Sequence, residues 1–234
     1  AASQLRDASE LTDSCYGFPD DNFNGTNCIK CTYGTSPHIV LDAGAAAIDF
    51  TLYDLDGAAW TLSEHLASQP VCLIWGMHTC PAFEGLGTAS PFDECAYWDE
   101  AALVAAYGGS GGGVAFAHLV GPEPHPITPD TNFDSGVVKV NFWSTVAQAR
   151  TYDARVAMAR AVADKVHPNA ALLPDLLPDA PYGDGDAAAA AQPVWCSYAH
   201  GARTAVLIGT DGVVRLAQTW FHAGDMAAAI EALL

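Results

Sequence analysis

A continuous apolar run, Val71–Trp75, is the feature that most constrains the fold of this chain. Five successive apolar side chains leave no polar face, which is typical of a strand in the middle of a sheet that is covered on both sides. Covered strands of this kind belong to parallel sheets, whose crossover connections are usually helices. The run therefore predicts an α/β protein, and it ends five residues before a Cys80-Pro81 step.

Other patterned segments surround this run in a regular order. Alternation at residues 48–53 predicts a strand followed by a turn at Asp56-Gly57, and a second buried strand is predicted at 114–120. The remaining predictions are a short helix capped by Thr61 or Ser63, helices at 93–107, 145–166 and 226–234, a short strand at 170–173, and a hairpin of 204–208 with 213–219.

This order predicts a central mixed sheet flanked by helices, with a terminal antiparallel hairpin. It is the order of a thioredoxin-like fold, whereas a flavodoxin-like order fits the final hairpin and helix poorly. We expect residues 44–234 to form this domain, with loop insertions near 86–95, 108–113 and 178–193.

The first 43 residues show no sustained periodicity and carry three of the seven cysteines. We predict an irregular N-terminal extension in which Cys15 pairs with Cys28 or Cys31. The alternative is a metal site formed by these three cysteines with His38, although structural zinc sites usually show two close ligand pairs.

Composition narrows the class of partner and the compartment. A formal net charge of -18 argues against a nucleic-acid partner, because phosphates would be repelled. No apolar stretch is long enough to cross a bilayer. The cysteine count, the sequon Asn24-Gly25-Thr26 and a start at Ala-Ala-Ser together favour a secreted or lumenal protein whose targeting segment has been removed.

Cys80 is the strongest candidate for chemistry because it follows a buried strand and precedes a predicted helix. Ligands of open α/β sheets bind beyond the carboxyl ends of the strands. A helix N-terminus and the neighbouring His78 both favour a thiolate. The alternative is that Cys80 is a small buried residue without reactivity. Cys95 and Cys196 are candidates to resolve an oxidised Cys80 or to form an inert disulfide, and Cys72 is expected to be a core residue.

The segment Gly76-Met77-His78-Thr79-Cys80-Pro81-Ala82-Phe83 resembles the active-site segment of the iodothyronine deiodinases, members of the thioredoxin-fold redoxin superfamily, with Cys80 in place of selenocysteine. The segment Glu123-Pro124-His125-Pro126 resembles another motif of that family. The resemblance implies that Cys80 is a nucleophile that attacks halogen, peroxide or disulfide. It also implies that His125 hydrogen-bonds or protonates the substrate and that Arg203 clamps an anionic group.

The chain departs from the family pattern at the positions that would complete a catalytic cycle. His78 and either Ala170 or Ala171 stand where the family carries further cysteines, and Phe83 replaces the second cysteine of a Cys-x-x-Cys pair. A cycle would therefore need Cys196, Cys95 or an external thiol as the resolving group.

Three functional hypotheses follow from these residues. The first is a thiol oxidoreductase that dehalogenates an aromatic or reduces a peroxide, with a small-molecule substrate, an external thiol reductant and no bound cofactor. The second is a catalytically inactive binding or structural subunit of a larger assembly. The third is a metal-binding protein that uses Cys80, His78 and His125.

Overall fold

A computed structural model of the chain describes residues 41–80, 83, 100–109, 113–123, 146–182, 193–198 and 203–234. The predicted N-terminal extension lies outside these residues except at 41–43. Cys15, Cys28, Cys31, Cys95 and His125 also lie outside them, so the roles given to these residues remain predictions.

A mixed five-stranded sheet forms the centre of the structure, in the order β5-β4-β3-β6-β7. The strands β3, β4 and β5 are parallel, whereas β6 runs antiparallel to both β3 and β7. A separate antiparallel hairpin is formed by β1 and β2. The strands are β1 (Thr51–Tyr53), β2 (Ala59–Thr61), β3 (Val71–Trp75), β4 (Ala115–Val120), β5 (Ala170–Pro174), β6 (Ala205–Ile208) and β7 (Val214–Gln218).

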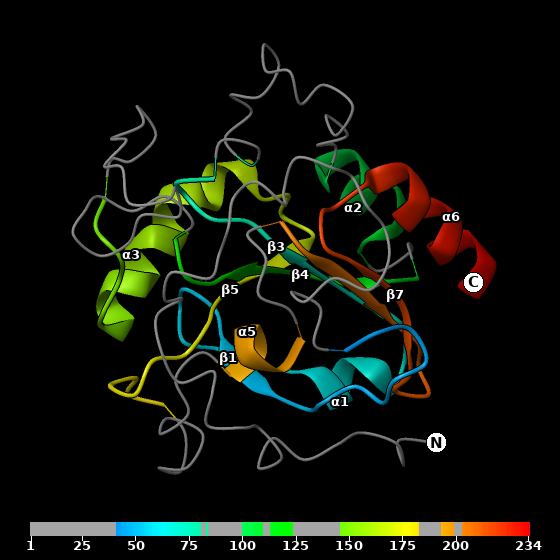
Figure 1. Ribbon diagram of the computed structural model, residues 1–234, viewed down its shortest axis with the longest axis horizontal. Helices are drawn as coiled ribbons and strands as arrows, with labels where there is room; N and C mark the ends of the chain where they lie inside the picture. Colours follow the sequence, from blue (N-terminus) through cyan, green and yellow to red (C-terminus); the bar gives the residue numbers. More distant parts are fainter. Residues whose placement is uncertain are drawn as a thin grey trace, which may run out of the picture.

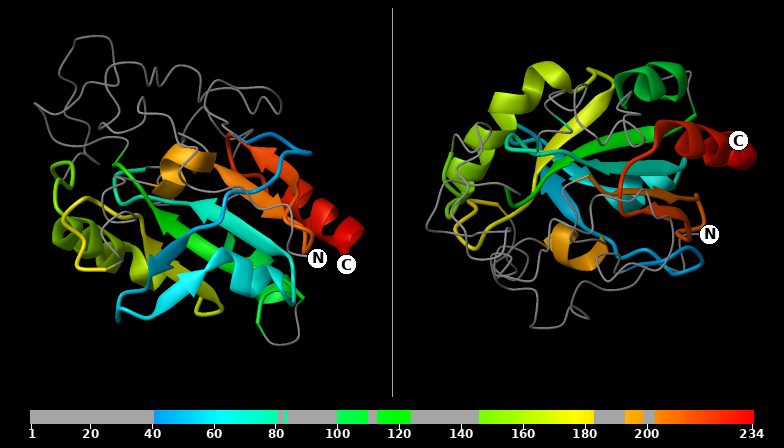
Figure 2. Two further views of the ribbon diagram at one scale, coloured as in Figure 1. Left: turned by 90° about the horizontal axis from the view of Figure 1, so that it is seen from below. Right: turned by 45° about the horizontal axis from the view of Figure 1, so that its top comes forward.

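Helices cover both faces of this sheet (Figures 1 and 2). The helices α2, α3 and α6 pack on one face, whereas α1, α5 and the β1–β2 hairpin lie on the other. The helices are α1 (Leu62–Leu66), α2 (Glu100–Tyr107), α3 (Tyr152–Val162), the 3-10 turn η6 (Ala163–Lys165), α5 (Pro193–Tyr198) and α6 (Ala223–Leu233).

Side-chain alternation along the central strand explains the two layers. Val71, Leu73 and Trp75 contribute to the core on the α1 and α5 side, and Cys72 and Ile74 contribute to the core on the α2 and α6 side. Every residue of β3 is buried, as the continuous apolar run predicts.

The strand order and directions are those of a thioredoxin-like fold, which confirms the predicted fold class. Two parallel crossovers, from β3 to β4 and from β4 to β5, extend the sheet on one side of the central strand. The antiparallel hairpin β6–β7 and the helix α6 complete it on the other side. The carboxyl ends of β3, β4 and β5 therefore lie at one edge of the sheet, beside the start of β6.

Two helices differ from the sequence prediction. The long helix predicted at 145–166 begins at Tyr152, because Thr151 adopts an extended conformation and its side chain accepts a hydrogen bond from the Ala154 N–H. The helix α5 was not predicted. Thr61 is the N-cap of α1, but its side chain makes no capping bond, and the Ser63 N–H instead donates to Asp49 Oδ1 at 3.0 Å.

Within the described residues, no helix combines the length and the apolar character that a membrane span requires.

Candidate active site

The loop that carries Cys80 leaves the sheet at the end of β3. The Trp75 N–H donates to the Thr204 carbonyl at 2.9 Å, and the Gly76 N–H donates to the Leu119 carbonyl at 3.2 Å. A turn follows at once, since the Cys80 N–H donates to the Met77 carbonyl at 3.0 Å. Cys80 is not disulfide-bonded and is only 2% exposed, so the loop holds the predicted nucleophile against the protein interior.

Glu123 lies three residues after the end of β4 and holds Thr79, the residue before Cys80. Its Oε2 accepts hydrogen bonds from both the backbone N–H and the hydroxyl of Thr79, each at 2.7 Å. Its other carboxylate oxygen, Oε1, is buried and has no hydrogen-bond partner among the described residues. The carboxyl group of Glu123 thus connects the Cys80 loop to the segment after β4 through one of its two oxygens.

The backbone and the charge of Glu123 are also set by buried neighbours. Gln148 accepts from the Glu123 N–H at 2.9 Å and donates to the Glu123 carbonyl at 3.1 Å. Burial raises the pKa of Glu123, although the hydrogen bonds from Thr79 and the charges of His78 and Arg155 act in the opposite direction. Glu123 therefore holds a proton more readily than an exposed glutamate does.

A second buried network lies on the other face of the sheet, below the end of β3. Glu100 on α2 contacts His118 on β4 through Oε1 and Nδ1 at 2.7 Å, and it accepts from Arg203 Nη1 through Oε2, also at 2.7 Å. His118 Nε2 lies 3.1 Å from the Gly76 carbonyl oxygen, and Arg203 Nη1 lies 3.3 Å from the Trp75 carbonyl oxygen. Two successive carbonyls before the Cys80 loop therefore face this network.

The electrostatics of this network are dominated by its two basic partners. Burial alone would raise the pKa of Glu100, but the charges and hydrogen bonds of His118 and Arg203 outweigh it and lower the pKa to about 2. Glu100 is therefore a carboxylate at neutral pH, and it forms a buried ion pair with Arg203.

Phe83 is the one described residue of the segment between Cys80 and α2, and its ring packs on this network. Its ring centroid lies 4.9 Å from that of His118 and 5.4 Å from the Arg203 guanidinium. A Cβ atom at Gly76 would lie 2.7 Å from the Phe83 ring and 2.5 Å from His118 Cε1, so this position requires glycine. Phe83, which replaces the second cysteine of a Cys-x-x-Cys pair, thus packs its ring on His118 and Arg203.

The helix α5 carries Cys196 and is positioned by Asp175, which follows β5. Asp175 Oδ2 accepts from the Trp195 N–H at 2.8 Å, and Oδ1 accepts from the Val194 N–H at 3.3 Å. Burial raises the pKa of Asp175 to about 6, despite these bonds and the charge of Arg155. The Trp195 ring packs closely on Gly121, where Met77 of the Cys80 loop also approaches, so α5 lies beside that loop.

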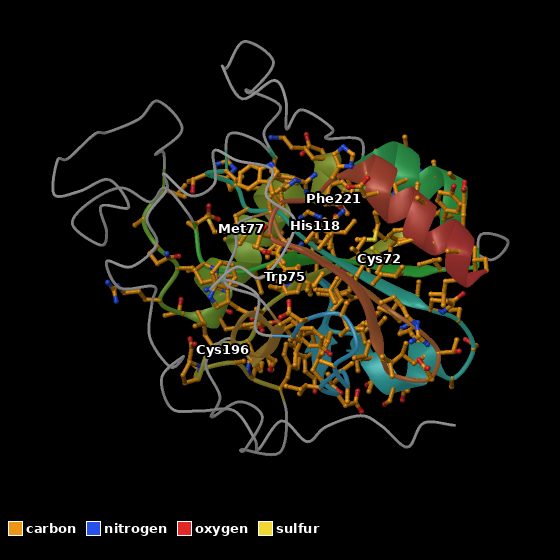
Figure 3. All side chains as sticks on the ribbon, turned by 45° about the vertical axis from the view of Figure 1, so that its right-hand side comes forward. Cys72, Trp75, Met77, His118, Cys196 and Phe221 are labelled. Carbon is orange, nitrogen blue, oxygen red and sulfur yellow. The ribbon has the colours of Figure 1, made fainter. Side chains whose placement is uncertain are left out.

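Three of the seven cysteines fall within the described residues. Cys72 and Cys80 are buried and are in no disulfide, whereas Cys196 is disulfide-bonded. Cys72 and Cys196 lie on opposite faces of the sheet (Figure 3). Burial and the charge of Glu100 raise the pKa of the Cys72 thiol well above its ordinary value, as expected for a core cysteine.

The structure brings together some of the residues that the sequence singles out. Cys80, His78 and Arg203 gather at the carboxyl edge of the parallel strands, but Arg203 is buried and its Nη1 is bonded within the protein. Its predicted role as an anion clamp is untested. The proposed metal site needs His125, and no group of three potential ligands occurs in the part of the chain that the structure describes.

Sequence reasoning did not assign roles to Glu100, His118 or Glu123. His118 carries a detectable signal, since it is the one polar residue in the apolar strand Ala115–Val120. A polar side chain in a strand that is buried on both faces must find partners inside the protein. Glu100 carries no such signal, because its burial depends on contacts with residues distant in sequence.

Comparisons with known proteins add structural likenesses at low identity. No model of a known protein family matches the chain, and no curated protein matches its sequence. One similar solved structure is a proposed protein disulfide isomerase from Bacteroides thetaiotaomicron, 16% identical, covering 86% of this chain and 94% of that chain with a TM-score of 0.47.

Two further similar structures come from bacteria. A thioredoxin-family thiol:disulfide interchange protein from Chlorobium tepidum is 11% identical, covering 86% of this chain and 99% of that chain with a TM-score of 0.41. A peroxidoxin from Mycobacterium tuberculosis is 17% identical, covering 83% of this chain and 99% of that chain with a TM-score of 0.36. Because these scores lie below 0.5, the fold assignment rests on the strand order and directions.

Proposed function

We propose that this protein is a thiol-dependent oxidoreductase whose nucleophile is the Cys80 thiolate. The observation that carries the proposal is the position of Cys80, a cysteine in no disulfide, after the carboxyl end of the central strand and next to a residue bonded twice to a buried carboxyl group. Open α/β sheets bind ligands at this edge. Burial of an acid beside a nucleophile is also an arrangement that shifts proton affinities at catalytic sites.

The substrate class we propose is an aromatic halide or a peroxide, as the deiodinase-like motif around Cys80 implies. With an aryl iodide, the thiolate sulfur would attack iodine and form a sulfenyl iodide, while the aryl carbon takes up a proton. With a peroxide, the sulfur would attack one oxygen and form a sulfenic acid, while the leaving alkoxide or hydroxide takes up a proton.

Both intermediates are reduced by thiols. A first thiol displaces iodide or water from the Cys80 sulfur and forms a mixed disulfide, and a second thiol reduces that disulfide and releases Cys80. We propose that Glu123 supplies the proton in the first step; this is supported by its Oε1, which has no hydrogen-bond partner among the described residues, and by the pKa that burial raises. We propose an external thiol as reductant; Cys196 could act only after its disulfide is reduced.

Turnover of two substrates tests this proposal. The purified chain with dithiothreitol should release iodide from an iodinated phenol or consume hydrogen peroxide faster than dithiothreitol alone. Cys80→Ser should abolish the excess rate. Cys72→Ala is the matched control, since it removes the other buried cysteine that is in no disulfide, and it should retain the rate. Loss of activity in both variants, or in neither, would contradict a specific role for Cys80.

A second candidate function is a catalytically inactive binding or structural subunit. It is favoured by the 2% exposure of Cys80 and by the anchoring of Phe83 at the position of a second cysteine. An inactive subunit would give no excess rate with either substrate while remaining folded.

We also propose a secreted or lumenal setting. The disulfide at Cys196 supports it, because structural disulfides persist in oxidising compartments and are rare in the cytosol. Alkylation of the protein as isolated from its native source, without reductant, should leave Cys196 unlabelled. Full labelling of Cys196 in such a sample would contradict the proposal.

A further inference from the structure

The Glu100 network is a buried charged cluster that the proposed reaction leaves unused. Glu100, His118 and Arg203 are 6%, 0% and 1% exposed. Removing three ionisable groups from water is costly unless each is paired and hydrogen-bonded. Such a cluster at the end of the strand that leads to Cys80 calls for a role in shaping that loop.

We propose that Glu100, His118 and Arg203 are positioning residues that hold the start of the Cys80 loop. In this proposal the His118 ring carries a proton on both nitrogens. The network then has a net positive charge, which favours the Cys80 thiolate. This inference rests on the proposed function of Cys80 as the nucleophile.

The positioning role follows from where the two basic side chains donate. Arg203 reaches the Trp75 carbonyl and His118 reaches the Gly76 carbonyl, which are the last strand residue and the first loop residue. Both donors are held by opposite oxygens of one carboxylate, Glu100. Movement of Glu100 would therefore release two successive backbone contacts.

The protonation state of His118 follows from its neighbours. Nδ1 lies 2.7 Å from a Glu100 carboxylate oxygen, and Nε2 lies 3.1 Å from the Gly76 carbonyl oxygen. Both of these atoms are hydrogen-bond acceptors, and a neutral imidazole has only one N–H to donate. Only the doubly protonated ring satisfies both contacts, whereas a neutral ring would direct a lone pair at an acceptor.

The charge balance of the network is then positive. Glu100 is ionised because its pKa is lowered to about 2, Arg203 is charged, and a doubly protonated His118 adds a second positive charge. Among the described residues, the other titratable groups recorded near this network are Cys72 on β3, whose pKa the charge of Glu100 raises, and Lys165, which lies 6.0 Å from the centre of the Phe83 ring. Neither cancels the positive charge at neutral pH, because the raised pKa keeps the Cys72 thiol neutral.

The charge lies close enough to matter at Cys80. The turn from Met77 to Cys80 keeps their Cα atoms within about 7 Å, so Gly76 Cα and Cys80 Cα lie within about 11 Å. Because the network contacts the Gly76 carbonyl, its charge lies within roughly 15 Å of Cys80. One net charge at about 15 Å with an effective dielectric constant of about 20 shifts a thiol titration by up to about one pH unit.

The first test measures His118 directly. Nitrogen-15 spectra of the histidine ring, assigned through its own backbone in the intact wild-type chain, should show both nitrogens protonated at pH 7. A spectrum in which one ring nitrogen carries no proton at pH 7 would overturn the proposal. This result does not depend on whether Cys80 reacts, so it separates failure of this inference from failure of the proposed function.

The second test measures the Cys80 titration by alkylation rate against pH. His118→Gln should raise the midpoint by about one pH unit and slow labelling at pH 6 by up to about tenfold. Glu100→Gln removes a negative charge and should move the midpoint in the opposite direction. The matched control is His65→Gln, because His65 lies on α1 and stacks on Trp60, and it should leave the midpoint unchanged.

Shifts of the same sign in His118→Gln and Glu100→Gln, or a wild-type midpoint in a folded His118→Gln protein, would overturn the charge argument. If neither variant folds, the nitrogen-15 spectrum of the wild-type chain decides the protonation state by itself.

Discussion

Asp175 provides a test in which the magnitude can be worked from the structure. The carboxyl group is buried, bonds to the first turn of α5, and has its pKa raised by burial to about 6 from an ordinary value of 3.8. A pKa difference of about 2 units between the folded and unfolded states corresponds to about 3 kcal/mol.

The sign of the pH dependence follows from the direction of this shift. Because the folded pKa is raised, the contribution of Asp175 to stability is fully present below pH ~4 and is lost as the pH rises through about 6. The free energy of unfolding of the wild type should therefore fall by about 3 kcal/mol from this group between pH 4 and pH 7. Asp175→Asn removes the titrating group, so this part of the fall should disappear.

Urea denaturation followed by tryptophan fluorescence at pH 4, 5, 6 and 7 measures the difference, with no reductant so that the disulfide at Cys196 is unchanged. Asp175→Asn also places an amide N–H₂ against a backbone donor, so its free energy of unfolding should be lower at every pH by about 1–3 kcal/mol. The test is therefore the slope of this free energy against pH. Asp179→Asn is the matched control, because Asp179 is exposed and accepts a hydrogen bond from the Tyr152 N–H. Parallel curves for the wild type and Asp175→Asn would refute the reasoning.

Three further predictions concern the two networks beside the Cys80 loop. Glu123→Ala removes the acceptor of two buried hydrogen bonds from Thr79 and should lower the free energy of unfolding by about 3 kcal/mol, whereas Glu123→Gln should cost about 1 kcal/mol or less; equal losses in urea denaturation would contradict this. Gly76→Ala places a Cβ atom 2.5 Å from His118 and should cost about 1–3 kcal/mol, so an unchanged Tm would contradict the packing. Because the pKa of Glu100 in the folded state is lowered to about 2, this group should contribute about 3 kcal/mol to the free energy of unfolding above pH ~4.5, and this contribution should be lost as the pH falls towards 2. An acid denaturation curve of Glu100→Gln that matches the wild type would contradict a stabilising ion pair.

The strands were predictable because their side-chain pattern is local. The apolar run Val71–Trp75 became the central strand, and the runs near 114–120 and 170–173 became its parallel neighbours β4 and β5. The turn signals at Asp56-Gly57 and around residue 210 became hairpins. Sequence order then determined the fold class, since parallel strands need crossovers and the final hairpin cannot continue them.

The helix α5 could not be predicted, because its six residues contain no apolar period. Its stability depends on contacts with residues far away in sequence. The Asp175 carboxylate accepts hydrogen bonds from its first turn, and the Trp195 ring packs closely on Gly121. The start of α3 was also wrong, because Gln148 pairs with the backbone of Glu123 instead of continuing a helix.

The candidate site was predictable only in its nucleophile. Cys80 stands out from its local context, but Glu123 acquires a role only when β3 and β4 lie side by side. The pairing of Glu100 with Arg203 joins residues that are 103 positions apart. Such contacts follow from tertiary packing, which no local pattern reports.

The central claim is that Cys80 is a reactive thiolate, and its alkylation in the native protein tests that claim most directly. Iodoacetamide labelling across pH 5 to 9, mapped by mass spectrometry, compares Cys80 with Cys72, which is also buried and in no disulfide. We expect Cys80 to label with a midpoint well below the free-thiol value of ~8.5 while Cys72 stays unlabelled until the protein unfolds. If Cys80 also labels only after unfolding, it is a core residue and the oxidoreductase account is wrong.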